Sequence, residues 1–259
     1  MKIAVAQTSP TALTDTELYG LEALCEEAAQ QGADILVTPE MGLTGYEAPL
    51  EALSSLALFV DDAILQKART LAKTYQLAIV LGYAEMDEQG RFYNSAQFIS
   101  AEGKCLQNYR KTHLYGDLDK SRFCAGSELM APVTYRDFKI SLAICYDVEF
   151  PELVRWHRCQ GADLLLVPTA NMHPFTTVAT HMIPSRSMEN GMVIAYANYT
   201  GLGRSIDYCG RSSICAADGQ CVATLEDSTG MLIADIQQKD IETARRQMPY
   251  LSDRRLDLY

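Results

Sequence analysis

The chain has 259 residues, 48% of them hydrophobic, and its 33 acidic residues against 22 basic ones give a formal net charge of −11. This length and apolar content allow one large α/β domain or two small ones, and no domain boundary is needed between residues 1 and 259. The acidic balance argues against nucleic acid or an anionic membrane surface as the main partner and favours a soluble enzyme or binding protein.

The N-terminal ten residues, MKIAVAQTSP, lack a basic region followed by a long apolar stretch. No segment approaches the roughly 20 apolar residues that are needed to span a bilayer, so we expect a cytoplasmic protein. The eight cysteines form no CxxC pair or His-rich spacing, and we expect reduced thiols and no metal. The short Gly-x-Gly at residues 201–203 is not a full dinucleotide fingerprint, so no cofactor is predicted.

The hydrophobic pattern of the first half predicts alternating strands and helices. Strands are predicted over residues 3–8, 33–40, 77–86, 91–100 and 103–110, and helices over 14–31 and 53–75. A polar connection over residues 112–136 follows. The second half is predicted to hold a strand over 140–145, a helix over 151–160, a strand over 162–170, a helix over 175–189 and a strand over 191–198. A hairpin around Asp218 and Gly219, the strand 230–236, a short charged helix and a polar tail end the chain, and this alternation is typical of the α/β class.

One internal echo suggests two similar half-domains. QGADILVTPE at residues 31–40 and QGADLLLVPT at residues 160–169 match without a gap in six residues, each after a predicted helix and at the end of an apolar strand. A sandwich with two sheets inside and helices outside fits such a duplication. Glu40 and residues 169–171 would then lie at equivalent strand ends, where α/β sheets tend to place ligand sites.

Three residues form a candidate catalytic unit. Cys145 follows a buried strand and precedes a helix, Glu40 ends another strand, and Lys111 lies where the run NYR gives way to a Gly/Asp loop. Each has a plain structural alternative: a core cysteine, a strand-end carboxylate facing water and a solvated lysine. Together, the thiolate of Cys145 attacks an amide carbon, Glu40 takes and returns the proton, and Lys111 with the Tyr146 N–H stabilises the oxyanion.

The sequence around these residues resembles the nitrilase superfamily of carbon–nitrogen hydrolases. TPEMGLTGY around Glu40, YRKTHLYG around Lys111 and ICYDVEFPEL around Cys145 are similar, in order and spacing, to its three motifs. PTANM at 168–172, SRSMEN at 185–190 and AYAN at 195–198 extend the resemblance over nearly the whole chain. It implies an αββα sandwich with a Glu-Lys-Cys triad. It also implies dimers or larger assemblies, with the C-terminal tail, here 239–259, crossing to the partner.

The chain departs from the family at one position. Many members place a second glutamate a few residues beyond the lysine, whereas the alignment on Phe123 and Gly126 puts Asp119 there, and Asp117 is the nearby rival. A carboxylate one methylene shorter could orient Lys111 or a water. The structural alternative is that both aspartates are turn residues.

Substrate contacts are expected in the loops around the triad, from Tyr46, Tyr115, Tyr146, Asn171, Met172 and Phe175. The run PTANM-x-P-F is similar to that of amidase-like members, which implies hydrolysis of a small carboxamide to an acid and ammonia. Nitrile hydrolysis, N-carbamoyl amine hydrolysis and an inactive scaffold or binding role are the alternatives. His113 or His157 could activate a thiol in a Cys-His arrangement, but no cysteine-protease signature surrounds any cysteine. We expect His113 to pack in its loop and His157 to face the outer side of its helix.

Overall fold

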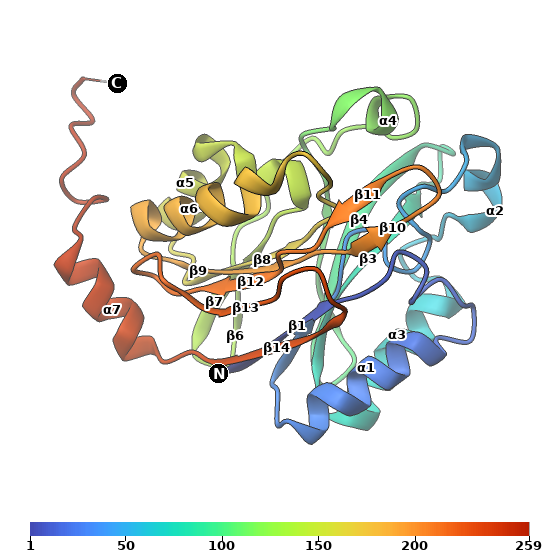
Figure 1. The fold of residues 1–259 in the computed structure, drawn as a ribbon, viewed down its shortest axis with the longest axis horizontal. Coiled ribbons are helices and arrows are strands. Elements are labelled where there is room, and N and C mark those ends of the chain that lie inside the picture. The colour runs from blue at the N-terminus through green and yellow to red at the C-terminus, as the bar shows by residue number, and fades with distance from the viewer. Residues whose placement is uncertain (259) are drawn as a thin grey trace.

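Two six-stranded sheets pack face to face, and helices cover the outer face of each, in the computed structural model, which describes residues 1–258 (Figure 1). The predicted four-layer αββα sandwich is therefore confirmed. In the described part of the chain, no helix is long and apolar enough to cross a membrane.

The first sheet has a parallel centre with antiparallel edges. Its order is β14 (Gly230–Asp235), β1 (Lys2–Gln7), β2 (Ile35–Val37), β3 (Ala78–Met86), β4 (Phe92–Ile99) and β5 (Cys105–Arg110). Strands β1, β2 and β3 are parallel, and β14, β4 and β5 pair antiparallel with their neighbours. The carboxyl ends of β2 and β3 therefore lie at one edge of the sheet.

The second sheet repeats this arrangement. Its order is β13 (Cys221–Thr224), β12 (Ser213–Cys215), β9 (Val193–Ala197), β8 (Leu164–Pro168), β7 (Phe138–Leu142) and β6 (Val133–Tyr135), with β7, β8 and β9 parallel. A separate hairpin of β10 (Thr200–Leu202) and β11 (Asp207–Cys209) lies beyond the end of β9.

Alternation of apolar residues along the strands supplies three core layers. Ile3, Val37, Ile140 and Leu166 belong to the layer between the two sheets. The opposite face of the first sheet packs on α1 (Tyr19–Gln30) and α3 (Ala63–Tyr75), and that of the second on α5 (Pro151–Cys159) and α6 (Ile183–Asn190). Side chains alternate between the two faces of a strand, and here both faces of each sheet carry apolar side chains. Each sheet is therefore packed against the other sheet on one face and against helices on the opposite face, which gives the four layers.

The two QGAD segments have the same local geometry. Asp34 donates its N–H to Lys2 O at 2.7 Å and accepts from Lys2 N at 2.7 Å, and Asp163 makes the same pair with Lys139 at 2.8 and 3.0 Å. Gly32 and Gly161 each adopt a positive φ at the end of the preceding helix. Equivalent residues thus end a helix and start the central strand of each sheet, as the sequence echo predicts.

Several predicted element boundaries are wrong. The first helix begins at Tyr19 rather than residue 14, because Asp15 accepts from Tyr19 N at 2.8 Å and closes a turn before it. The helix predicted over 53–75 is two helices, α2 (Leu53–Leu56) after the 3-10 turn η1 (Leu50–Ala52), and α3. Between them, Leu58 exchanges backbone hydrogen bonds with β3, and its N–H donates to Ala84 O at 2.9 Å. This pairing holds the backbone around Leu58 in an extended conformation and so interrupts the helix.

Irregular structure replaces other expected elements. The connection 112–136, predicted to be irregular, contains α4 (Gly116–Lys120) and β6. The strand predicted over 33–40 pairs with its neighbours in the sheet only over β2. The helix predicted from residue 175 begins with a π-helical turn, η3 (Val178–Met182), which leads into α6. The C-terminal charged helix is α7 (Gln238–Gln247). Turns and contacts with distant segments set the ends of these elements, and the local hydrophobic pattern does not indicate either.

Two side-chain expectations are also corrected. His157 is fully buried rather than on the outer side of α5, because it shares the sheet-facing side of the helix with Leu153 and Val154. Cys215 and Cys221 form a disulfide rather than two reduced thiols, because the β12–β13 register places them opposite each other.

Candidate active site

Cys145 lies three residues beyond the end of β7, at the start of the 3-10 turn η2 (Cys145–Glu149), rather than inside a strand. Its φ of 47° is left-handed, a conformation that a side-chain-bearing residue adopts only when its surroundings impose it. Such strain is common at functional sites, where a sharp turn between strand and helix projects a nucleophile from the sheet edge.

Glu40 lies beyond the carboxyl end of β2, and two residues of the second half of the chain hold its backbone. Its N–H donates to Thr169 O at 3.2 Å, and the Tyr199 hydroxyl donates to Glu40 O at 2.8 Å. Residues 39–41 pass close to Gly82 on β3, where a Cβ would lie 2.5 Å from Met41 N. Glycine at this position therefore allows the strand to approach the carboxylate's backbone.

Lys111 directly follows β5 and is fixed from both sides of its backbone. Its N–H donates to Asn94 O on β4 at 2.8 Å, and its carbonyl accepts from Gly126 N at 2.8 Å. The ladder between β4 and β5 thus continues by one residue and aims the lysine inward, where its side chain is fully buried.

The structure brings Glu40, Lys111 and Asp119 into one buried cluster. Lys111 Nζ donates to Glu40 Oε1 and to Asp119 Oδ2, each at 2.7 Å. The cluster lies next to Cys145, whose pKa is affected by both Glu40 and Lys111. The sequence alternatives of an exposed glutamate and a solvated lysine are excluded by this burial.

Asp119, and not Asp117, belongs to this cluster. Both oxygens of Asp119 are used: Oδ1 accepts from the Tyr46 hydroxyl at 3.0 Å, and Oδ2 also accepts from Tyr115 N at 3.0 Å. Asp117 is exposed on the other side of α4. Asp119 therefore stands beside Lys111 in the place that the family resemblance assigned to a second acid.

Burial and charge set the protonation of the cluster. Burial raises the pKa of Glu40, while Lys111 opposes the rise. Burial and the Glu40 charge raise the pKa of the Cys145 thiol well above its usual range, again against Lys111. Burial disfavours the charge on Lys111, but Glu40, Cys145 and Asp119 together raise its pKa well above the usual range. The resting state therefore combines a neutral thiol with an ammonium group.

One carboxylate oxygen is free to take a proton. Glu40 Oε1 accepts from Lys111 and from Asn94 Nδ2 at 2.6 Å, whereas the buried Oε2 has no hydrogen-bond partner among residues 1–258. This buried oxygen belongs to a carboxylate close enough to Cys145 for its charge to raise the pKa of the thiol, which makes Glu40 a candidate general base.

Cys145 opens onto a cavity of about 240 Å³ at this edge of the sheets. All six residues that the sequence analysis assigned to substrate contacts line it: Tyr46, Tyr115, Tyr146, Asn171, Met172 and Phe175. Glu149 and Ala170 complete the wall. The Asn171 side chain is largely engaged in its own loop, since its Nδ2 donates to Phe175 O at 3.1 Å and its Oδ1 accepts from Met172 N at 2.9 Å.

Sequence reasoning did not identify two positioning residues. Asn94 bridges the backbone of Lys111 and the carboxylate of Glu40. Asp147 accepts from Tyr109 OH, Thr112 Oγ1 and His113 N, all at 2.9 Å, and so ties the turn after Cys145 to the loop after Lys111. The signals that could have identified them were the polar residues inside the predicted strand at FYNSAQF and the first of the two acids in CYDVEF.

The histidines take no part in a Cys-His pair. His113 lies in the loop after Lys111, stacks on Phe150 with ring centroids 4.0 Å apart and bonds to Asp147. His157 lies in the core between α5 and the second sheet.

No group of three or more His, Cys, Asp or Glu side chains in residues 1–258 is arranged to hold a metal ion.

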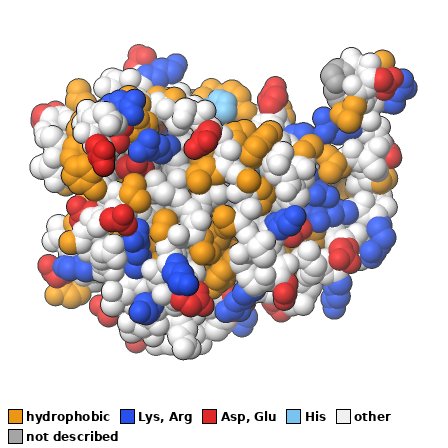
Figure 2. Space-filling model, turned by 180° about the vertical axis from the view of Figure 1, so that it is seen from behind, with side chains coloured by type: hydrophobic (Ala, Val, Ile, Leu, Met, Phe, Trp, Pro, Cys, Tyr) orange, Lys and Arg blue, Asp and Glu red, His pale blue; other side chains and the backbone are white. Residues whose placement is uncertain are grey.

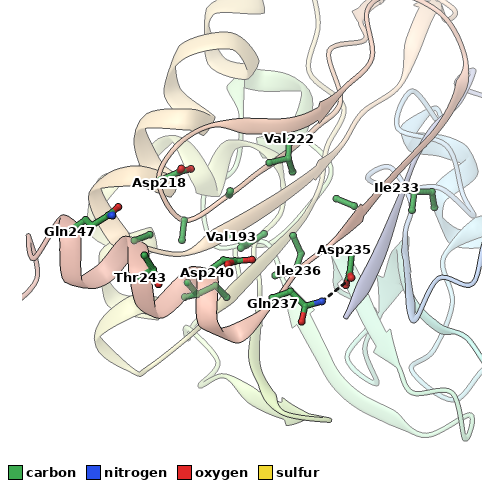
Figure 3. Close-up of a pocket in the computed structure, with 15 residues that line it drawn as sticks. Val193, Asp218, Val222, Ile233, Asp235, Ile236, Gln237, Asp240, Thr243 and Gln247 are labelled. Carbon is green, nitrogen blue, oxygen red and sulfur yellow. Dashed lines mark hydrogen bonds between the residues drawn. The ribbon is translucent and has the colours of Figure 1, made fainter.

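A second hollow, of about 500 Å³, lies between α7 and the β12–β13 hairpin (Figure 3). Val222, Ile236 and Asp240 contribute to its walls, and Gln237 Nε2 donates to Asp235 Oδ2 at 2.8 Å along its edge. It contains neither a thiol nor a lysine, so it lacks the groups for acyl transfer that surround Cys145.

The chain is similar to known proteins along nearly its whole length. Residues 2–246 match the model of the protein family described as carbon-nitrogen hydrolase. A protein of Pseudomonas protegens named "Hydrolase in pqqF 5'region" is 42% identical over 100% of this chain and 90% of its own length. The (R)-stereoselective amidase of a Pseudomonas species is 33% identical over 87% of this chain and 81% of its own.

Solved structures of an amidase from Nesterenkonia sp. are similar over the whole fold. One has a TM-score of 0.88 and 31% identity and covers 100% of this chain and 94% of that one. In a mutant of that amidase, with a TM-score of 0.87, the acetamide moiety of fluoroacetamide is added covalently at the active-site cysteine. The active-site cysteine of that protein thus reacts covalently with fluoroacetamide, a small amide.

Proposed function

The chain belongs to the carbon–nitrogen hydrolase family, and from this membership we propose that it hydrolyses small linear carboxamides to the carboxylic acid and ammonia, with Cys145 as the nucleophile. As a member of the nitrilase superfamily it is a thiol-dependent amidase. The observation that carries the proposal for this chain is the unpartnered Oε2 of Glu40, held beside Lys111 and the cavity that contains Cys145.

In the first half-reaction, Glu40 Oε2 takes the proton of the Cys145 thiol as sulfur attacks the amide carbon. The carbonyl π electrons move to oxygen, which the third, unused N–H of Lys111 and the Tyr146 N–H stabilise. When the C–N bond breaks, Glu40 returns the proton to the leaving nitrogen. Ammonia departs and a thioester remains on Cys145.

In the second half-reaction, a water attacks the thioester carbon while Glu40 again takes a proton. As the C–S bond breaks, Glu40 gives this proton to the sulfur, which restores the thiol of Cys145, and the carboxylic acid leaves. Asp119 accepts from Lys111 and from Tyr46 throughout, and so holds both the cation and one wall of the cavity in place.

The size of the cavity supports a small substrate. About 240 Å³ lies below the range of roughly 300–1,000 Å³ typical of drug-sized ligands. Aromatic rings form its walls, with Tyr115 and Tyr146 at 5.3 Å and Tyr115 and Phe175 at 6.1 Å between centroids. Phe175, whose side chain is 44% exposed, stands at the mouth.

The test is ammonia release from purified protein on a panel of amides, nitriles and N-carbamoyl amines. We expect turnover of short amides, no turnover by Cys145→Ala with an unchanged unfolding temperature, and wild-type turnover by the control Cys159→Ala, which alters an exposed thiol. Mass spectrometry of the wild-type protein, quenched in acid during turnover of an amide, should find an acyl adduct on Cys145. Activity in Cys145→Ala, or turnover of nitriles alone, would contradict the proposal.

A further inference from the structure

Glu149 is the one carboxylate among the residues that line the cavity of Cys145. It ends the 3-10 turn that Cys145 begins, so the same short segment carries both side chains to the cavity. The mechanism above gives Glu149 no task. The other lining side chains are aromatic, aliphatic or amide groups, apart from the nucleophile.

The cations near Glu149 are engaged with other groups. Arg186 on α6 donates to the backbone carbonyls of Val148 and Glu149, at 3.2 and 2.7 Å, and to Glu189 Oε1 at 3.1 Å. Lys111 is held by Glu40 and Asp119. Among residues 1–258, no ion pair or hydrogen bond involves the Glu149 carboxylate, which is half-buried.

The charged state of Glu149 is under opposing influences. Burial raises its pKa, whereas the charges of Lys111 and Arg186 lower it. A half-buried carboxylate without a protein partner gains from a donor or cation that a ligand brings and is repelled by a ligand carboxylate. Water screens charges less in a cavity than at an open surface, so both effects act on the bound substrate.

We propose that Glu149 sets the substrate charge: the enzyme selects carboxamides whose acyl part carries an amino group and rejects those whose acyl part carries a carboxylate. This inference rests on the proposed amidase function and narrows its substrate class. Apolar amides of the same size fill the aromatic cavity without contacting the Glu149 carboxylate, and their kcat/KM lies between those of the two charged classes. Discrimination of this kind uses attraction of one class together with repulsion of another.

Two isosteric substrate pairs test the proposal. 3-Aminopropanamide and butyramide have the same number of heavy atoms and differ in one positive charge, and succinamate and succinamide differ in one negative charge. In wild-type protein we expect kcat/KM to favour 3-aminopropanamide over butyramide, and succinamide over succinamate, each by about 10-fold or more. In Glu149→Gln both ratios should fall about 10-fold, and in Glu149→Lys both should reverse.

The matched control is Glu152→Gln, which makes the same chemical change three residues further on, at an exposed position on α5. Its two ratios should equal those of the wild type. A general structural effect of Glu149→Gln would change all four substrates alike and leave the ratios constant. That outcome, in protein that still hydrolyses butyramide, would overturn the inference and leave the amidase function intact.

A binding measurement separates the inference from the chemistry. In a Cys145→Ala background, calorimetry should find that 3-aminopropanamide binds about 10-fold more weakly once Glu149→Gln is added, while butyramide does not. If the wild type hydrolyses no amide at all, the proposed function fails. Equal affinities for 3-aminopropanamide in the two backgrounds would overturn the role of Glu149 by itself.

Discussion

At the scale of single residues, Asp119 has the most demanding position in the site. It is fully buried, and its two oxygens accept from Lys111, Tyr46 and the Tyr115 N–H. A buried carboxylate with three donors is costly to remove, because each donor is then left without a partner. Asp119 acts on Lys111 rather than on the reacting atoms, so we propose it as a positioning residue.

We predict that Asp119→Ala lowers kcat by about 100-fold with a smaller change in KM, because Lys111, the oxyanion donor in the proposed mechanism, loses its orientation. Asp117→Ala, at an exposed position two residues away, should stay within about 2-fold of wild type. Steady-state kinetics on one amide measures both. Equal small losses in the two variants would show that neither aspartate supports catalysis.

Gly82 controls the position of Glu40 from a neighbouring strand. A Cβ at residue 82 would lie 2.5 Å from Met41 N and 3.0 Å from both Glu40 C and Pro39 O. These are backbone atoms, which cannot move aside cheaply. The side chain of Glu40 would have to move with them.

We expect Gly82→Ala to reduce kcat/KM by at least about 10-fold and the free energy of unfolding by about 1–3 kcal/mol. Gly230→Ala is the control, because its Cβ would meet only the Leu225 side chain, at 3.5 Å. Kinetics and urea titration of both variants provide the comparison. Full activity in Gly82→Ala would show that the Glu40 backbone tolerates displacement.

At the scale of elements, α5 connects η2, the turn that carries Cys145, to the second sheet through its apolar side. That side includes Leu153, Val154 and His157, and neither ring nitrogen of His157 has a hydrogen-bond partner among residues 1–258. Burial lowers the pKa of His157 to about 4, from 6.5 for the free side chain. The folded protein therefore holds the neutral ring, and protonation favours the unfolded chain.

This linkage predicts acid sensitivity with a definite sign. Below pH 6.5 the unfolded state binds a proton that the folded state binds only near pH 4, so the free energy of unfolding falls as the pH falls through this window. The loss that belongs to His157 is about 3 kcal/mol in total.

His157→Phe should remove that part of the pH dependence, since phenylalanine does not titrate. Urea unfolding at pH 7 and pH 4.5 should therefore give a smaller difference in this variant than in the wild type. His181→Phe, at an exposed position, should behave like the wild type. An unchanged difference in His157→Phe would mean that other groups cause the acid sensitivity.

At the scale of the whole molecule, the C-terminal tail packs least against the remainder of the protein. Figure 2 shows its end standing apart from the remaining surface. The side chains of Leu256 and Leu258 are each 68% exposed, and Tyr250 is 44% exposed. Apolar side chains on a projecting segment are typical of a contact with another molecule.

We propose that residues 1–259 form one catalytic domain and that residues 239–259 serve subunit assembly, most simply in a homodimer. Helix α7, which forms the first part of this segment, is attached to the body by Arg245, which pairs with Asp163 at 2.9 Å and donates to Gly191 O at 2.8 Å. The tail thus starts from a fixed point and extends beyond it (Figure 1).

Sedimentation or light scattering should therefore find a dimer, and removal of residues 249–259 should shift it to monomer at micromolar concentration. The double change of Leu256 and Leu258 to Ser should act in the same direction, because it removes the exposed apolar area. Leu50→Ser changes another exposed leucine, 53% accessible, and should leave the dimer intact. A monomeric wild type would contradict the assembly proposal.

Much of the fold was predictable because strand and helix periodicities are local properties of the sequence. The α/β class, the two-sheet arrangement suggested by the QGAD echo, and the separate motifs around Glu40, Lys111 and Cys145 all follow from local patterns and a family resemblance. Boundaries failed where a distant strand intervened, as when pairing of Leu58 with β3 divided a predicted helix.

The sequence by itself determined which chemical groups the protein has and along which motifs they lie. Only the tertiary structure decided which of them meet. Asp117 and Asp119 are two residues apart, so on a helical turn they point about 200° apart, and the fold alone selects the one that faces Lys111. His157 is inside and Glu149 lines the cavity for the same reason. Direction depends on packing against segments distant in the chain, and local sequence does not encode it.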